Sequence, residues 1–417
     1  MRVCVIVDAY STGNQLAKYF KENNYKVIHV QSSQVPPKIL SNSYKCKDFD
    51  TNIVYDGNFT KIIKELDKYT PEIVLTGSET GVELADVLAD HYNLLNNDID
   101  LSNSRRNKYA MIDTIKNSGL RVANQIKSNS FNEIISWVKK INTWPIVLKP
   151  LSSAASDNVR ICKTLMEVEK AFNNIIGEEN SLGILNQEVL AQEYIEGNQY
   201  MVNAVSINGE HYITDLWFEG IYEVDNFSII YDHWNLLSKE SLIYKDLITY
   251  TKKVLTSVGV KYGATHSEVR LTNDGPTIIE TSARTMGLSF DEEIFKGVLG
   301  YSQAELTAYS YIDKNMFFKK YNAFSENAGY LKITFLSSQE DSTLNSEIED
   351  LKRLGTVKKI HLIKKPGDVI EKTTEPMMHP GWVYQISNKI EELAIDYNLI
   401  REDENNEKFY NPTYTRN

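Results

Sequence analysis

The first hundred residues alternate short apolar runs with amphipathic stretches. The apolar runs predict buried strands, at residues 2–7, 26–30, 53–54 and 72–76. The stretches between them predict helices, one ending at Phe20 and one over residues 59–69. A strand, a polar turn and a helix in repetition indicate a doubly wound parallel sheet. Ligands bind such sheets at the carboxyl ends of the strands, so the turns at residues 10–13 and 76–81 are candidate parts of a site.

The pattern changes after residue 105. Helices are predicted over residues 108–117 and 131–141, followed by a strand at 145–149 and a loop of small residues at 150–159. Two hairpins are predicted farther along, one over 200–217 that turns at Asn208-Gly209 and one over 265–284 that turns at 273–275. The last hundred residues predict strands at 329–336 and 357–363 and a final helix at 383–397.

Length and composition narrow the class of protein. A chain of 417 residues is long enough for about three domains. The net charge of -11 argues against a broad surface for nucleic acid, and no apolar run approaches the roughly 18 residues of a membrane span. The three cysteines lie far apart and form no metal-binding pair, which favours a reducing compartment. We therefore expect a cytoplasmic, multidomain α/β protein without nucleic-acid or membrane partners.

Two glutamates in the second hairpin are the first candidate chemistry. Side chains alternate faces along a strand, so His266, Glu268 and Arg270 share one face. With the turn centred on Asp274, Glu268 and Glu280 lie directly opposite each other, and two like charges so placed are destabilising. A divalent cation bound by both would cancel the repulsion, and Mg²⁺ takes one or two carboxylates plus substrate phosphates. A solvated charged face on an ordinary hairpin explains the local pattern about equally well.

Basic residues upstream are candidates for phosphate binding. Lys149 ends a buried strand and opens the loop of Ser and Ala residues, whose backbone N–H groups can approach phosphate oxygens closely. A surface lysine before a loop is the simpler interpretation of Lys149 alone. Lys108, at the start of a predicted helix, is a weaker candidate, because charges at such positions are usually solvated.

Taken together, these pieces resemble the ATP-grasp superfamily over nearly the whole chain. The order matches: a Rossmann-like front domain, a helix that starts with Lys, a strand that ends in Lys-Pro, a small-residue lid loop, the hinge-like segment 192–197 and the two-glutamate hairpin. The resemblance implies an α/β ATP-grasp fold in three parts. These are a Rossmann-like domain at 1–104, an ATP-binding region at 105–310 with a lid subdomain at about 122–193, and a C-terminal α+β domain at 311–417.

Within that superfamily the chain is most similar to the bacilysin-synthetase type of L-amino acid ligases. The motifs that carry this likeness are Ala264-Thr-His-Ser-Glu-Val-Arg270, Glu280-Thr-Ser-Ala-Arg284 and Thr76-Gly-Ser-Glu79. The resemblance implies that Arg284 stabilises an acyl phosphate, that Glu268 and Glu280 bind Mg²⁺ (with Mn²⁺ as an alternative), and that Glu79 and His266 seat the first amino acid. The residues implied to bind ATP are Lys108, Lys149, Ser156, Glu193, Tyr194, Ile195 and Gln199.

The chain departs from the general ATP-grasp pattern at three positions. Ser282 stands where many members have Asn, although the bacilysin-type ligases also lack that Asn. The lid loop at 152–158 contains no glycine, so its closure is expected to differ. Gln199 stands where many members have a ribose-binding glutamate, and its amide can also form hydrogen bonds there.

The expected function is an ATP- and Mg²⁺-dependent ligase that joins two L-amino acids through an aminoacyl phosphate and releases ADP and phosphate. Its partners would be small amino acids, and a homodimer is left open. Leu288 stands four residues after Arg284, where the bacilysin synthetase has tryptophan, which predicts a roomier first-substrate pocket; a plain core leucine is the alternative. The acidic composition loosely favours a basic first substrate such as arginine. The rival functions are ligation of a carboxylate that is not an amino acid, and silent nucleotide binding.

Overall fold

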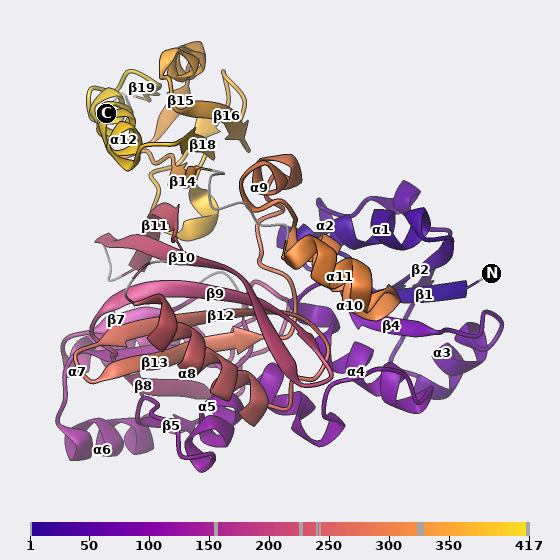
Figure 1. Ribbon diagram of the computed structural model, residues 1–417. Helices are drawn as coiled ribbons and strands as arrows, with labels where there is room; N and C mark the ends of the chain where they lie inside the picture. The colour runs from indigo at the N-terminus through magenta and orange to yellow at the C-terminus, as the bar shows by residue number, and fades with distance from the viewer. Residues whose placement is uncertain are drawn as a thin grey trace.

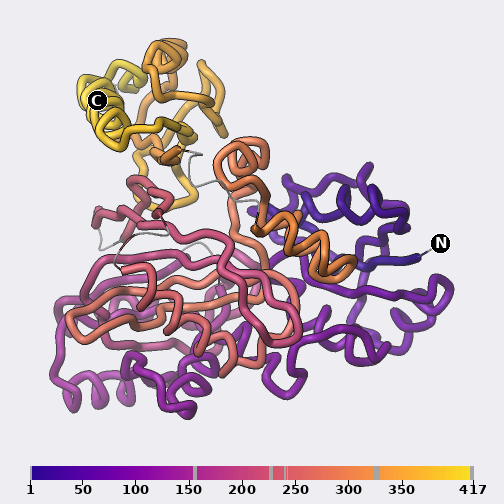
Figure 2. Tube along the Cα trace, viewed as in Figure 1, coloured from indigo at the N-terminus to yellow at the C-terminus, as the bar shows by residue number. Residues whose placement is uncertain are grey.

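The structure is a computed structural model that describes residues 2–153, 157–224, 228–238, 241, 243–322 and 329–413. Figure 1 shows the N-terminal sheet at one side of the molecule, a long antiparallel sheet through its centre and the C-terminal segment above that sheet. The Cα trace shows the first strand, Arg2–Val7, well apart from the helix Ile390–Asn405 near the other end of the described chain (Figure 2). The fold is a mixed α/β architecture, as the sequence predicts.

The N-terminal sheet has four parallel strands in the order β3-β2-β1-β4. Their bounds are Arg2–Val7 (β1), Tyr25–Gln31 (β2), Thr51–Val54 (β3) and Ile73–Thr76 (β4). Apolar side chains of the strands pack against helices on both faces, which confirms the predicted doubly wound sheet. The helices from this part of the chain that pack on the sheet are Leu16–Glu22 (α1), Phe59–Leu66 (α3) and Val82–His91 (α4). The short helix Lys38–Ser41 (α2) lies between β2 and β3 and has no buried residue.

Two glycines bring the candidate turns of this sheet together. A Cβ atom on Gly13 would lie 2.0 Å from the carbonyl oxygen of Gly77, and one on Gly77 would lie 2.6 Å from Ala9 Cα. These distances are far below van der Waals contact, so only glycine fits at either position. The turns after β1 and β4 therefore meet at the carboxyl edge of the sheet, as predicted.

A second, antiparallel sheet has the order β5-β8-β6-β7. Its strands are Gln125–Ser128 (β5), Ile146–Pro150 (β6), Arg160–Cys162 (β7) and Val189–Glu193 (β8). Helices Phe131–Ile141 (α6) and Leu165–Ile175 (α7) cover it with a common apolar core, and Lys108–Asn117 (α5) leads into it. The bounds of α5 and α6 are those predicted.

The third sheet has eight strands in the order β13-β12-β9-β10-β11-β14-β18-β16. Five come from the middle of the chain: Asn198–Ile207 (β9), Glu210–Val224 (β10), Ser228–Leu236 (β11), Gly263–Thr272 (β12) and Gly275–Ser282 (β13). Three come from its end: Tyr330–Phe335 (β14), Val357–Leu362 (β16) and Gly381–Ser387 (β18). The C-terminal segment thus extends the central sheet. The predicted turn at Asn208-Gly209 joins β9 to β10, with positive φ at both residues.

Helices cover both faces of the long sheet. Helix α8 (Tyr244–Ser257) packs on one face, and α9 (Glu292–Leu299), α10 (Gln303–Ile312) and α11 (Lys314–Tyr321) contribute to the core on the other. Figure 1 shows α10 beside the N-terminal sheet, where Ala304 and Ala308 join the core of that sheet. Helix α10 therefore links the N-terminal sheet to the centre of the molecule.

The predicted helix over residues 383–397 is wrong in its first half. Residues Gly381–Ser387 form strand β18, and helix α12 spans Ile390–Asn405. Each of Trp382, Val383 and Tyr384 is buried, because β18 lies between two other strands and is covered on both faces. A strand buried on both faces shows no alternation, so its apolar run cannot be told from a helix by period. The remaining strands, Ser342–Leu344 (β15), Val369–Ile370 (β17) and Tyr410–Pro412 (β19), form a small sheet beside α12.

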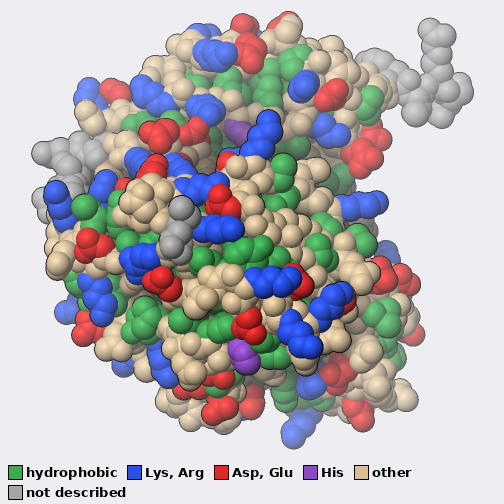
Figure 3. All heavy atoms as spheres, turned by 90° about the vertical axis from the view of Figure 1, so that its right-hand side faces the viewer, with side chains coloured by type: hydrophobic (Ala, Val, Ile, Leu, Met, Phe, Trp, Pro, Cys, Tyr) green, Lys and Arg blue, Asp and Glu red, His purple; other side chains and the backbone are tan. Residues whose placement is uncertain are grey.

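The surface view in Figure 3 shows Lys and Arg side chains interspersed with Asp and Glu on the face that it presents. Among the side chains coloured there, neither sign of charge dominates that face. No helix in the part of the chain that the structure describes is long and apolar enough to cross a membrane.

Candidate active site

A cavity of about 560 Å³ lies where the three sheets and the C-terminal segment meet. Its walls come from the turn after β4, the start of α5, β6, the segment after β8, strands β9 to β13 and β18. Every described residue that the sequence singled out as a candidate lines this cavity; they are Glu79, Lys108, Lys149, Glu193, Tyr194, Ile195, Gln199, His266, Glu268, Glu280, Arg284 and Leu288. Ser156 lies outside the described residues. The structure therefore brings the described candidates together, while their individual roles stay predictions.

Glu268 and Glu280 are direct cross-strand partners on β12 and β13. The turn is centred between Asn273 and Asp274, half a residue earlier than predicted, because Thr272 pairs with Gly275. An irregularity in the register between Glu268 and Val269 leaves Ile279 as an extra residue on β13 and restores the pairing of the glutamates. The predicted pairing is confirmed, and it depends on this bulge as well as on the turn.

Two lysines face the glutamate pair. Lys108 Nζ lies 2.8 Å from Glu280 Oε2 and donates a hydrogen bond of 3.0 Å to the carbonyl oxygen of Ser153. Burial alone would raise the pKa of Glu280, but the ammonium groups of Lys108 and Lys149 outweigh burial and hold that pKa below its usual value. Burial, with the repulsion from Lys108, lowers the pKa of Lys149 to about 8. The pair of ammonium groups is thus arranged to attract a polyanion.

The segment after β8 is held against β12 by Arg270. Its guanidinium donates a hydrogen bond of 2.6 Å to the carbonyl oxygen of Ile195 and stacks 4.7 Å from the ring centre of Tyr194. The Glu193 side chain accepts hydrogen bonds from Asn124, whose carbonyl oxygen also accepts the Glu193 backbone N–H. Arg270 therefore fixes the segment to which the resemblance assigns adenine binding.

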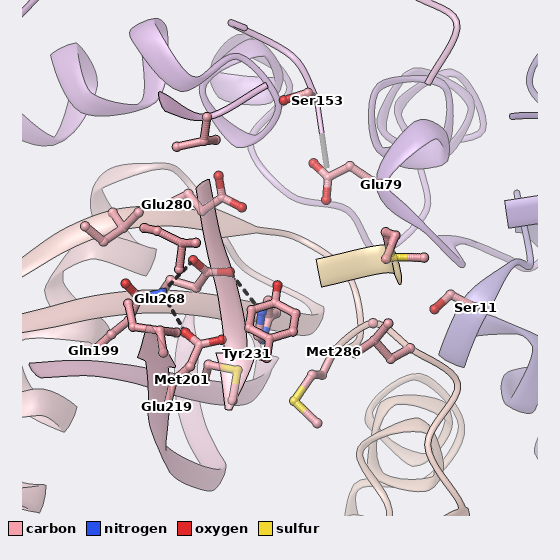
Figure 4. A pocket seen from close by; sticks show the side chains of 18 of the residues that line it. Ser11, Glu79, Ser153, Gln199, Met201, Glu219, Tyr231, Glu268, Glu280 and Met286 are labelled. Carbon is pink, nitrogen blue, oxygen red and sulfur yellow. Dashed lines mark hydrogen bonds and ion pairs between the residues drawn. The ribbon is translucent and has the colours of Figure 1, made fainter. Parts of the chain in front are cut away.

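Both the nitrogen and the oxygen of the Gln199 amide form hydrogen bonds in this structure. Its nitrogen donates to Glu219 Oε2 at 2.6 Å and to Glu268 Oε2 at 3.3 Å, and its oxygen accepts a hydrogen bond from Arg270. Figure 4 shows Gln199, Glu219 and Glu268 grouped on one side of the cavity, with Glu79 across from them. A ribose hydroxyl would have to share or replace one of these partners.

Glu79 forms an ion cluster with two arginines. Its carboxylate accepts hydrogen bonds from Arg284 Nε at 2.9 Å, from the Ser282 hydroxyl at 2.6 Å and from Arg106 at 3.2 Å. Burial opposes ionisation, but the charges of Arg284 and Arg106 prevail and lower the pKa of Glu79 to about 2. The predicted amino-group contact of Glu79 would therefore have to compete with partners it already has. In this structure the Glu79 carboxylate holds the side chain of Arg284 at the wall of the cavity.

His266 and Leu288 occupy different walls. His266 is buried on β12, where its Nδ1 lies 2.8 Å from Asn203 Oδ1 and its Nε2 lies 3.8 Å from Glu268 Oε1. Leu288 follows β13 in a left-handed conformation with φ of 69°. It lines the cavity and also packs on the edge of the central core, so both sequence interpretations of Leu288 agree with its position.

Glu219 is a cavity residue that the sequence analysis did not identify. It lies on β10 beside Gln199 and is 2% exposed. Burial, reinforced by the charge of Glu268, raises its pKa to about 8. Side chains alternate along Trp217-Phe218-Glu219, so Glu219 lies on the same face as Trp217, which is buried. An acidic residue on the face of a buried tryptophan is the sequence signal that could have identified Glu219.

The donor set suits Mg²⁺. No group of three or more His, Cys, Asp or Glu side chains among the described residues is arranged to hold a metal ion by itself. Glu268 and Glu280 supply two opposed carboxylates, and Mg²⁺ is usually held by one or two carboxylates together with substrate phosphates. The residues present therefore fit a cation that binds with its nucleotide.

Comparison with known proteins agrees with this geometry. Residues 142–290 match the model of the ATP-grasp domain. The dapdiamide A synthase of Enterobacter agglomerans is 32% identical over 389 residues, which cover 92% of this chain and 91% of that protein.

Two solved structures show the same fold. The L-amino acid ligase of Bacillus licheniformis aligns with a TM-score of 0.74 at 14% identity over 96% of this chain and 97% of its own. A carboxyaminoimidazole ribonucleotide synthase of Aspergillus clavatus, complexed with ATP, aligns with a TM-score of 0.68 at 12% identity over 97% and 98%.

The fold and the cavity thus define an ATP-binding enzyme. The chain belongs to the ATP-grasp ligases, which form C–N bonds. Its similarity to dapdiamide A synthase spans nearly the full length of both proteins.

Proposed function

We propose that this protein joins two L-amino acids into a dipeptide, using ATP and Mg²⁺ and releasing ADP and phosphate. The observation that carries the proposal is the arrangement of charged side chains around one cavity. The Glu268–Glu280 pair and two lysines line one part of it, and Arg284, held by Glu79, lines another. A site suited to phosphoryl transfer therefore lies next to Arg284, whose positive charge suits a substrate carboxylate. Similarity to an L-amino acid ligase and to dapdiamide A synthase supports the same chemistry.

The residues would divide the work as follows. Lys108 and Lys149 would bind the phosphates of ATP, and Glu268 and Glu280 would hold Mg²⁺, which neutralises charge on the transferred phosphoryl group. The substrate carboxylate attacks the γ-phosphorus, ADP leaves, and an acyl phosphate forms. The amine of the second substrate then attacks the acyl carbon, and phosphate leaves. Arg284 would stabilise the negative charge that develops on the acyl oxygen.

The cavity also protects the intermediate. Acyl phosphates hydrolyse, so water has to be excluded while the amine arrives. Lys108 already connects α5 to Ser153, at the start of the predicted lid loop, and Asn180 donates a hydrogen bond to the carbonyl oxygen of Ser152. A nucleotide bound at Lys108 would therefore act, through this hydrogen bond, on the first residues of that loop.

The test is phosphate release from ATP and Mg²⁺ over a panel of single and paired L-amino acids, with the product mass measured. Release that needs two particular amino acids, with a product equal to their sum minus water, would establish the proposal. Arginine belongs in the panel as the predicted basic first substrate. Glu268→Gln serves as the inactive control, since it keeps the shape of the side chain and removes the charge.

One observation favours a second candidate. The Glu79 carboxylate is already satisfied by Arg284, Ser282 and Arg106, so a free ammonium group is not required to balance it. A carboxylic acid without an α-amino group would then serve as the acyl substrate, with an amino acid as the amine. Adding simple monocarboxylic and dicarboxylic acids to the same panel decides between the two.

A further inference from the structure

A row of polar side chains runs from the cavity into the interior of the long sheet. His266 on β12 pairs directly with Asn203 on β9, and Asn203 is the neighbour of Asp215 on β10. All three side chains are buried: His266 is 7% exposed, Asn203 is 1% exposed and Asp215 is 5% exposed. Polar groups this deep need defined partners, and each finds one in the row.

With Asp215 ionised, every hydrogen bond in the row can run in only one direction. The indole nitrogen of Trp217 can only donate, and it donates to Asp215 Oδ1. In the ionised carboxylate neither oxygen carries a proton, so Oδ1 can only accept. The Asn203 side chain contacts the same Oδ1, so it must present its NH₂ group there. Thr214 donates to the other oxygen, Oδ2.

The orientation of Asn203 fixes the proton on the histidine ring. With its NH₂ group toward Asp215, Asn203 presents its carbonyl oxygen to His266 Nδ1 at 2.8 Å. A carbonyl oxygen can only accept, so Nδ1 must carry a hydrogen. In the neutral ring the lone pair then lies on Nε2, the nitrogen on the side of Glu268.

Nε2 and Glu268 Oε1 lie 3.8 Å apart, and both residues line the cavity. Two acceptors this close repel each other unless a donor group serves both. We propose that Asp215 and Asn203 are positioning residues that hold His266 in the Nδ1–H tautomer, so that Nε2 accepts a hydrogen bond from the amino group of an amino-acid substrate. The identity of the donor rests on the proposed function, whereas the tautomer rests on the contacts of an ionised Asp215.

The first measurement is the ¹⁵N NMR spectrum of the nucleotide-free protein labelled in its histidine rings, because the shifts of protonated and unprotonated ring nitrogens are well separated. The His266 signals are identified by their loss in His266→Gln. In the neutral ring we expect Nδ1 protonated and Nε2 unprotonated. A neutral ring with its hydrogen on Nε2 would overturn the proposal without any variant of the row.

Two replacements with the same branched shape then separate positioning from mere packing. Asp215→Asn can keep an acceptor oxygen toward Trp217 and Asn203, so the tautomer and the kinetics should survive. Asp215→Leu removes the acceptor and frees Asn203 to rotate, so the Nε2–H form should appear. The KM of one amino-acid substrate should then rise about tenfold, the scale of one lost hydrogen bond, with the KM for ATP unchanged.

Each remaining outcome is decisive. A mixed tautomer in Asp215→Leu with an unchanged amino-acid KM would show that Nε2 contacts no substrate, and so would overturn the role. Equal rises in both KM values, with no change of tautomer, would indicate a structural effect only. If the wild-type protein used no amino acid at all, the proposed function would fail and the donor assignment with it. The tautomer of the free protein would still report whether the row positions the ring.

Discussion

Lys149 should make the binding of nucleotide measurable as a change in protonation. It is 4% exposed at the end of β6, and the structure shows no hydrogen bond from its ammonium group to any of the described residues. Burial and Lys108 lower its pKa to about 8 against a usual 10.5. This difference corresponds to about 3 kcal/mol that disfavours the charged form while the site holds no phosphate.

ATP should reverse that balance. Phosphate oxygens next to the ammonium group favour its charged form and return the pKa at least to its usual value. At pH 8 the free protein has Lys149 about half protonated, so binding should take up about 0.5 proton per ATP from this residue. The uptake should fall to about 0.1 proton at pH 7 and rise to about 0.9 at pH 9.

Isothermal titration calorimetry measures this uptake when each pH is run in two buffers of different ionisation enthalpy. The titrations use ATP in EDTA, so that Mg²⁺ binding does not add protons of its own. Glu219 also titrates near pH 8, so the series is run in a Glu219→Gln background. Lys149→Arg is the matched control, because an arginine stays protonated throughout and can bind phosphate without uptake.

The reasoning has a clear point of failure. If proton uptake at pH 8 is the same in the Lys149→Arg variant as in the protein that keeps Lys149, then Lys149 is already fully charged in the free protein. Burial at the end of β6 would not have the effect described here. An uptake that does not change between pH 7 and pH 9 would lead to the same conclusion.

Three further predictions concern single side chains. Glu280→Gln should raise the Mg²⁺ concentration needed for half-maximal ATP turnover by about tenfold or more, since one of two paired carboxylates is lost; an unchanged Mg²⁺ requirement in a metal titration would remove Glu280 from the metal site. Leu288→Trp should shift the ratio of kcat/KM toward small first substrates, and an unchanged ratio between alanine and larger amino acids would show that Leu288 is only core. Glu219 has a raised pKa, so the folded state keeps a proton that the unfolded state loses as the pH rises from about 4.5 to about 8, and the free energy of unfolding falls over that window. Glu219→Gln should therefore gain stability relative to the wild type, on the order of a few kcal/mol, between about pH 5 and pH 8 in Mg²⁺-free urea titrations, and parallel curves would contradict the raised pKa.

The sequence predicted the local parts of this structure well. Helices 108–117 and 131–141 and the hairpin at Asn208-Gly209 depend on period, capping and turn residues that are adjacent in the chain. The pairing of Glu268 with Glu280 was also predicted, although the count from the turn missed the extra residue Ile279. A bulge depends on how a strand fits its neighbours, and one strand's residues alone do not reveal it.

Contacts between distant strands could not be predicted in the same way. Glu219 reaches Gln199, and Asn203 reaches Asp215, only because β9 and β10 pair in one particular register. The ion pairs of Glu79 with Arg106 and Arg284 likewise depend on the position of the N-terminal sheet against β13. Family resemblance placed most candidates in one cavity, but it did not indicate which of them already have partners.

The order of strands in the long sheet has a consequence for how the chain is made. Strand β11 pairs with β14, which pairs with β18, and β18 lies about 150 residues after β11 in the chain. During synthesis the central strands therefore emerge long before the strands that complete their edge. Until β14 and β18 follow, β11 presents unpaired backbone groups, the kind of edge that invites association with other chains. Chains that stop before β18 should consequently be prone to aggregate even though every proposed ATP-binding residue is already present.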